Sequence, residues 1–165
     1  MNKLIIFKGR LFSVVCFFLV LLFSQVSLSE TVLIEDIPDS GVFLHEKMDF
    51  IFDPSDEVDQ ERLLYGAYVN DFKPYTDINL IKQNESLWFR FEVENSSTVN
   101  EKLMLSLDYI FFNEVEVVYL HRDGYFHELA GMNFPESHRS IGTRYFTFPV
   151  DVDAGEKKFI YIRMK

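Results

Sequence analysis

The sequence predicts an all-β domain, an antiparallel β-sandwich of the jelly-roll type, with one short helix. Three observations support this prediction. From Leu87 onward, apolar and polar residues alternate in short segments, which is the period of half-buried strands. Turn residues separate these segments, and no helical pattern lies between them. Six or more strands in such an order are typical of a sandwich or jelly roll.

Residues 1–29 have the parts of an export signal peptide. Lys3, Lys8 and Arg10 form a basic region, and residues 11–23 form an almost wholly apolar core. Small residues stand at 27 and 29, so we expect cleavage between Ser29 and Glu30. Residues 30–165 are then 136 residues long, enough for one domain with its own core.

An uncleaved membrane anchor is the alternative for this segment. The apolar run of residues 11–28 approaches the roughly 18 residues that indicate a transmembrane helix. Gln25 and three serines weaken that interpretation. In both cases the short basic end stays inside and the remainder lies outside the cytoplasm. We therefore expect the domain in the periplasm or at the extracellular face of the inner membrane.

Charge and cysteine usage exclude several classes of function. The chain has a formal net charge of −10, and the predicted signal holds three basic and no acidic residues. The exported part therefore carries about −13, which repels phosphate backbones and anionic lipids. Nucleic acid is not an expected partner. The single cysteine, Cys16, lies inside the signal, so we expect neither disulfides nor thiol chemistry in the domain.

The first part of the domain, residues 30–83, is irregular. Short apolar pieces at residues 31–34 and 49–52 are interrupted by prolines and glycines. Residues 53–64 start with serine and aspartate, which cap helices, and have acidic residues in the first turn. We expect one short helix here that ends near Gly66, and we expect this zone to wrap the sheet that follows.

The second part contains the regular strands. Leu87 and every second residue to Val93 are apolar, and leucines repeat in the same way at 103, 105 and 107. Further strands are expected at residues 115–120, 125–130, 145–150 and 159–163. Turn residues lie at 95–98, 122–124 and 153–155, and Asp123-Gly124 is the clearest hairpin signal.

Aromatic and guanidinium side chains are the candidate ligand-binding residues. Trp88 and Arg90 project from the face of their strand opposite the apolar row. A sugar has an apolar face and a polar rim, so an exposed ring beside a charged group suits it. Tyr109, with two phenylalanines nearby, is the candidate rim ring. Arg139 lies in a long polar loop, where recognition usually resides.

Each of these residues also has a purely structural interpretation. A covered sandwich buries both faces of a central strand, and Trp88 would then belong to a core. A salt bridge from Arg139 would pin its loop to the acidic domain. Both interpretations stay open at the level of sequence.

The sequence patterns of the common enzymes are missing. There is no Gly-rich phosphate loop, no nucleophile elbow and no zinc-protease motif. The histidines are scattered, which makes a weak case for a metal site. Glu114 and Glu116 share one strand face, in the manner of a glycosidase pair, but such pairs arise by chance in an acidic chain. We therefore expect no enzymatic activity, no metal and no cofactor; a β-sandwich glycosidase is the third hypothesis.

The order of motifs resembles the second type of extracellular domain of seven-transmembrane receptors with diverse intracellular signalling modules (7TMR-DISM). The resemblance runs from about residue 30 to residue 164. It rests on a Trp-x-Arg-Phe strand, a Val-x-Val-x-Tyr strand, a Gly-x3-Pro-x3-Arg loop, a Phe-Pro strand and a Tyr-x-Arg strand. These motifs begin at Trp88, Val115, Gly131, Phe148 and Tyr161.

This resemblance implies a non-enzymatic sensor domain of jelly-roll type, related in fold to carbohydrate-binding modules. In that family the domain precedes seven membrane helices and an output module such as a diguanylate cyclase or histidine kinase. The sequence stops at Lys165, so we expect either the sensor part of a receptor or a free-standing homologue. The membrane would be reached through a missing receptor part or an uncleaved signal.

The expected ligand is a carbohydrate or a similar small polar molecule. The alternative function is a periplasmic protein-interaction module, in which a sandwich face or an edge strand docks another protein. A second copy of the chain, forming a homodimer, is the further candidate partner.

Overall fold

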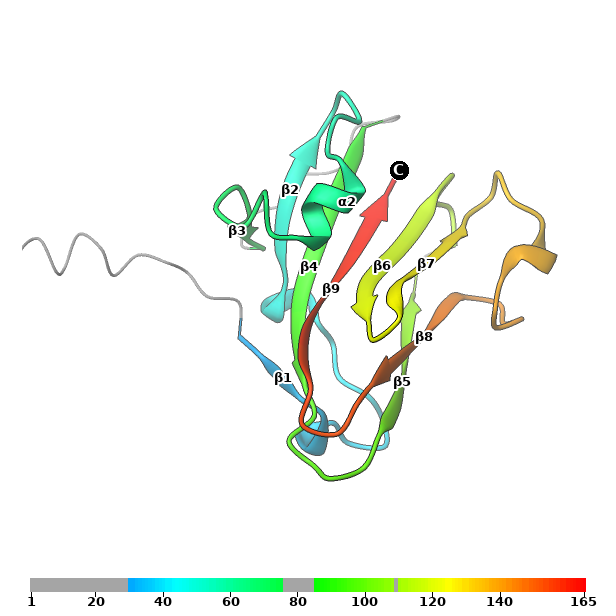
Figure 1. Ribbon diagram of the computed structural model, residues 1–165. Helices are drawn as coiled ribbons and strands as arrows, with labels where there is room; N and C mark the ends of the chain where they lie inside the picture. The colour runs from blue at the N-terminus through cyan, green and yellow to red at the C-terminus, as the bar shows by residue number, and fades with distance from the viewer. Residues whose placement is uncertain (1–29, 76–84, 109) are drawn as a thin grey trace, which may run out of the picture.

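The computed structural model describes residues 30–75, 85–108 and 110–165 (Figure 1). The predicted signal peptide, Cys16 and Tyr109 lie outside these ranges, and the signal stays a prediction. Nine strands and one α-helix are described. They are β1 (Val32–Leu33), β2 (Asp49–Asp53), α2 (Gln60–Leu64), β3 (Lys73–Pro74), β4 (Ser86–Glu94), β5 (Glu101–Leu107), β6 (Val115–His121), β7 (Gly124–Ala130), β8 (Phe146–Val152) and β9 (Lys157–Met164). In the described ranges, no helix has the length and apolarity needed to cross a membrane.

The strands form a large sheet and a small one. The large sheet has the order β3-β2-β4-β9-β6-β7, and β1 adds to β4 as its one parallel neighbour. The small sheet consists of β5 paired with β8. Figure 1 shows the small sheet beside the lower part of the large one. The prediction of an antiparallel all-β sandwich with one short helix is confirmed.

The core between the sheets is built by the alternating rows that the sequence predicts. Leu87, Phe89, Phe91 and Val93 point inward from β4, and the inward residues of β8 meet them from the small sheet. These β8 residues are Phe146, Phe148, Val150 and Val152. Each fully buried side chain of this kind stabilises the fold by about 1.5–3 kcal/mol, so this core holds the two sheets together.

A third layer covers the other face of the large sheet. Leu63 and Leu64 of α2 pack on Trp88, Val118 and Tyr161, and all five side chains are buried. Figure 1 shows α2 in front of the large sheet, over β4 and β9. The central strands are therefore buried on both faces. The alternation of apolar and polar residues in β4 does not by itself reveal that the face carrying Trp88 is covered.

The helix is shorter than expected because an aspartate turns the chain before it. The Asp53 carboxylate accepts hydrogen bonds from the backbone N–H groups of Glu57 and Val58, and this closes a turn. The helix begins after Asp59, whose side chain accepts from the Arg62 N–H. It ends at Leu64, close to Gly66 as predicted, and Gly66 follows the last turn with a left-handed φ of 81°.

The predicted turns are present at their positions. β6 and β7 form a hairpin that places His121 opposite Gly124. Asn95 ends β4 and is fully buried, and its side-chain amide donates to the carbonyls of Val99, Val152 and Asp153. One amide group thus joins the end of β4 to the turn between β8 and β9.

Candidate functional site

Trp88 is not an exposed platform. Its side chain is 2% exposed, lies under α2 and has Val118 and Tyr161 as neighbours in the same cluster. Within the described part of the chain, its indole N–H has no hydrogen-bond partner. The ring therefore belongs to the layer between α2 and the large sheet, and the expectation of an exposed sugar-stacking surface at Trp88 is wrong.

Arg90 lies on the same strand face as Trp88, as expected, but it is 6% exposed. Its Nε and Nη2 atoms donate to Oδ2 of Asp49 at 3.1 and 3.0 Å. Nη1 donates to the Val69 carbonyl at 3.2 Å. The guanidinium also lies 4.2 Å from the centre of the Phe72 ring. These contacts occupy the group, so Arg90 offers no exposed cation to a ligand.

Arg139 braces its own loop. Its guanidinium lies 4.7 Å from the centre of the Phe146 ring and donates to the Thr143 carbonyl at 3.3 Å. Phe146 belongs to the core between the two sheets, whereas Trp88 lies on the opposite face of the large sheet. The structure does not bring Arg139 together with Trp88 and Arg90. The fourth candidate, Tyr109, lies outside the described residues.

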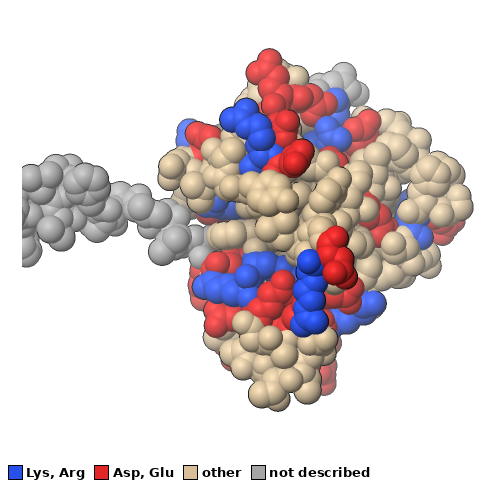
Figure 2. Space-filling view, in the orientation of Figure 1, with Lys and Arg blue, Asp and Glu red and all other residues tan. Residues whose placement is uncertain are grey.

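The glutamates and the basic residues near the end of the chain form an ion-pair network. Arg163 contacts Glu116 at 2.7 Å, Asp56 at 2.9 Å and Glu114 at 3.5 Å. Lys165 also binds Asp56, at 2.5 Å. Figure 2 shows basic side chains lying directly against acidic ones on the face it displays. Glu114 and Glu116 are thus neutralised by a cation and do not face each other across a cleft.

This network changes the acidity of Asp56. Partial burial alone would raise the pKa of its carboxyl group. The hydrogen bonds from Lys165, Ser86 and Arg163 outweigh that effect and lower the pKa from 3.8 to about 2. The cluster therefore ties the turn before α2 to the last strand, β9, at neutral pH.

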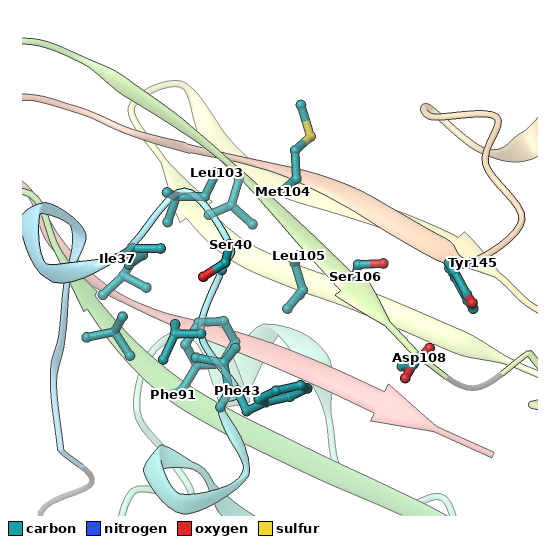
Figure 3. Close-up of a pocket in the computed structure, with 16 residues that line it drawn as sticks. Ile37, Ser40, Phe43, Phe91, Leu103, Met104, Leu105, Ser106, Asp108 and Tyr145 are labelled. Atoms are coloured by element: carbon teal, nitrogen blue, oxygen red, sulfur yellow. The ribbon is translucent and has the colours of Figure 1, made fainter.

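A groove between the segment of residues 37–44 and the small sheet is the candidate functional site. It has a volume of about 400 Å³, within the range of small-ligand sites. One wall is the segment of residues 37–44, the other is β5, and Phe91 and Val93 of β4 lie between them. In Figure 3 Phe43 lies close to Phe91. The groove thus lies between residues 37–44 and the small sheet.

The lining of this groove is mainly apolar, with polar groups at a few points. Phe43 is 82% exposed, and Tyr145 presents a second partly exposed ring. Ser40 and Ser106 contribute hydroxyl groups, and Asp108 is the one charged residue among the described lining residues. Figure 3 shows Tyr145 and Asp108 at the end of the groove away from Ile37. This arrangement can hold an apolar group and leaves a carboxylate at one end.

Sequence reasoning missed this groove. Phe43 lies in an irregular segment without a strand period, and its exposure depends on how residues 37–44 cross the sandwich. The available signal was Val42-Phe43-Leu44, an apolar triplet directly after Gly41 in an otherwise polar stretch. An apolar triplet of this kind is equally typical of a short core strand, so it does not identify a groove.

A comparison with models of protein families shows to which family the chain belongs. The model described as 7TMR-DISM extracellular 2 matches residues 45–165. The chain belongs to the 7TMR-DISM extracellular 2 family. No curated protein matches the chain.

The 7TMR-DISM extracellular 2 family comprises extracellular or periplasmic sensor domains of membrane receptors, and it is not a family of enzymes. The predicted resemblance is therefore confirmed, and an extracytoplasmic location agrees with it. The match includes β5 and β4 but begins just after residue 44. One wall of the groove thus lies inside the matched range, and the wall of residues 37–44 precedes it.

Proposed function

We propose that the domain is the ligand-sensing part of an extracytoplasmic receptor and that its ligand binds in the groove between residues 37–44 and β5. The observation that supports this most strongly is the exposed ring of Phe43 over an apolar groove of about 400 Å³. An exposed aromatic side chain beside a hollow apolar surface typically marks a contact site. The faces of the large sheet are covered by α2 and by the small sheet.

The composition of the groove bears on the class of ligand. Trp88 and Arg90, the residues that favour a carbohydrate at the level of sequence, are both buried. The groove offers Phe43 and Tyr145 as rings, yet most of its other lining side chains are aliphatic. Sugars need several fixed polar partners around each ring. The lining therefore favours a ligand with a larger apolar surface than a sugar presents. Sugars are included among the compounds that the experiment below compares.

Signalling would follow from a population shift. A ligand that touches both residues 37–44 and β5 favours the arrangement in which these walls hold it. The equilibrium can move by no more than the ligand's differential affinity for the two arrangements. In a receptor, this difference would be transmitted to the segment that follows β9.

A thermal-shift screen with a blocked groove tests this proposal. Ser40 is exposed and lines the groove, so Ser40→Trp fills it without disturbing the core. Ser137→Trp is the matched control, since Ser137 is exposed and does not line the groove. We expect a compound from a panel of sugars, amino acids, peptides and amphiphiles to raise the Tm of wild type and S137W but not of S40W. Equal shifts in all three proteins would contradict the proposed site.

A further inference from the structure

The groove runs along the backbone edge of β5. It is lined by Leu103 and Leu105, which point toward the sandwich core, and also by Met104 and Ser106, which point outward. Successive side chains of a strand lie on opposite faces of a sheet. A groove that touches both sets must lie beside the strand, along its edge.

This edge of β5 has no partner strand among the described residues. All seven residues of β5 pair with β8 on the other side, from Glu101 opposite Val152 to Leu107 opposite Phe146. In an antiparallel pair, every second residue points its N–H and C=O groups away from the partner. Part of the β5 backbone therefore faces the groove with its donors and acceptors available.

The opposite wall, residues 37–44, is not shown to form backbone hydrogen bonds with the free edge of β5. Residues 37–44 have no strand conformation, and the described backbone hydrogen bonds in this segment are local, such as Gly41 to Pro38. The side chains of this wall, including Val42 and Phe43, approach the groove. The groove thus combines a free strand edge on one side with apolar side chains on the other.

We infer that the ligand of this groove is an extended peptide segment that adds to β5 as a third strand of the small sheet. This inference rests on the proposed function and names the ligand class. Strand addition takes its affinity from main-chain hydrogen bonds and its specificity from pockets for alternate side chains. Here one set of side chains enters the apolar floor at Phe91 and Leu105, and the other set lies beside Met104.

The charges of the domain select among peptides. Asp108 is the charged residue of the described lining, and the domain carries a large negative net charge. An acidic peptide is repelled, and a basic side chain or a free amino terminus pairs with Asp108. The peptide therefore alternates apolar residues, lacks Asp and Glu, and places a positive charge at the Asp108 end.

A single strand suits the groove better than the edge of a second folded copy. In every copy, residues 37–44 flank β5, so two β5 edges approach each other only if both flanking segments move. An isolated extended segment needs no such movement. A dimer is therefore one of the outcomes that the experiment must separate.

A random heptapeptide library, panned on the wild-type domain after depletion on S40W, tests the inference. The selected peptides are synthesised with N-methyl groups on alternate amides, in two complementary sets, and their affinities are measured by calorimetry. We expect alternating apolar sequences without acidic residues. One methylation set blocks the peptide edge that faces β5 and should weaken the affinity at least tenfold. The other set should leave the affinity within about twofold of that of the unmethylated peptide. Binding should also slow amide exchange in β5.

Several outcomes would overturn the inference. These are an absence of groove-dependent peptides, equal effects of the two methylation sets, or a concentration-dependent dimer that alone protects β5. If a sugar or an amphiphile raises the Tm of wild type but not of S40W while no peptide does so, the peptide inference fails and the proposed function stands. If no compound or peptide distinguishes wild type from S40W, both fail.

Discussion

Arg90 and Asp49 form a buried ion pair across neighbouring strands of the large sheet, with Nη2 and Oδ2 3.0 Å apart. They are directly opposite each other in the register of β4 and β2, and both are more than nine-tenths buried. The pair fixes β2, the strand that precedes the α2 layer, to the central strand. Its geometry makes Arg90 a structural residue.

Removing one partner of this pair should destabilise the domain strongly. Arg90→Met leaves the Asp49 carboxylate buried without its cation, which costs about 3–5 kcal/mol. Urea unfolding of R90M should show this loss in the free energy of unfolding. The double variant R90M/D49L should recover part of it, because it removes both charges. Arg144→Met is the control, since Arg144 is exposed. If R90M and R144M are equally stable, the pair has no structural role.

Asn95 should contribute more to the stability of the domain than an ordinary turn asparagine does. Asn95→Ala leaves the carbonyl of Val152 with one donor fewer in a fully buried position. An unsatisfied buried polar group costs about 1–3 kcal/mol, and N95A should lose at least that much in urea unfolding. Asn133→Ala, at an exposed site, should change stability by less than about 0.5 kcal/mol. Similar losses in the two variants would contradict the role of Asn95.

Gly131 should not tolerate a side chain. A Cβ atom at this position would lie 2.2 Å from the Asn113 carbonyl oxygen, and the φ of 135° disfavours any other residue. Gly131→Ala should therefore lower stability by at least about 2 kcal/mol. Gly142→Ala is the matched control, because nothing lies within 4 Å of its Cβ position. Equal Tm values for G131A and G142A would show that the backbone at Gly131 can relax.

The ion pairs of Asp56 should make stability depend on pH. The folded-state pKa of Asp56 is about 2, below the ordinary value of 3.8. A depressed pKa adds stability above the unfolded value, and this contribution disappears as the pH falls through about 2. Asp56→Asn keeps a residue that tolerates the φ of 57°. The stability difference between wild type and D56N should therefore be largest above pH 5 and shrink toward pH 2. A constant difference would contradict this explanation.

The sandwich could be predicted because its strands alternate with period two. Leu87, Phe89, Phe91 and Val93 form the inner row as expected, and Gly66 and Asp123-Gly124 are at the ends and turns assigned to them. These features depend on local residue patterns and backbone preferences, so they can be predicted from the sequence alone.

The site could not be predicted in the same way. Trp88 and Arg90 alternate out of the core row. Trp88 is buried in the cluster with the leucines of α2, whereas Arg90 is buried against Asp49 of β2 and Phe72, which follows α2 in the chain. Nothing near Arg90 in the sequence identifies Asp49 as its partner, 41 residues away. The groove likewise depends on residues 37–44 crossing to β5, a contact between segments about 60 residues apart. Sequence patterns describe a strand and its two faces, but not what covers each face.

Amide hydrogen exchange of the bound domain tests the central claim most directly. The measurement compares exchange with and without a ligand that raises the Tm of wild type. Binding in the groove predicts slower exchange in β5 and in residues 37–44, with little change in α2. Protection centred on α2 and the strand face of Trp88 and Arg90, with β5 unchanged, would contradict the groove as the sensing site.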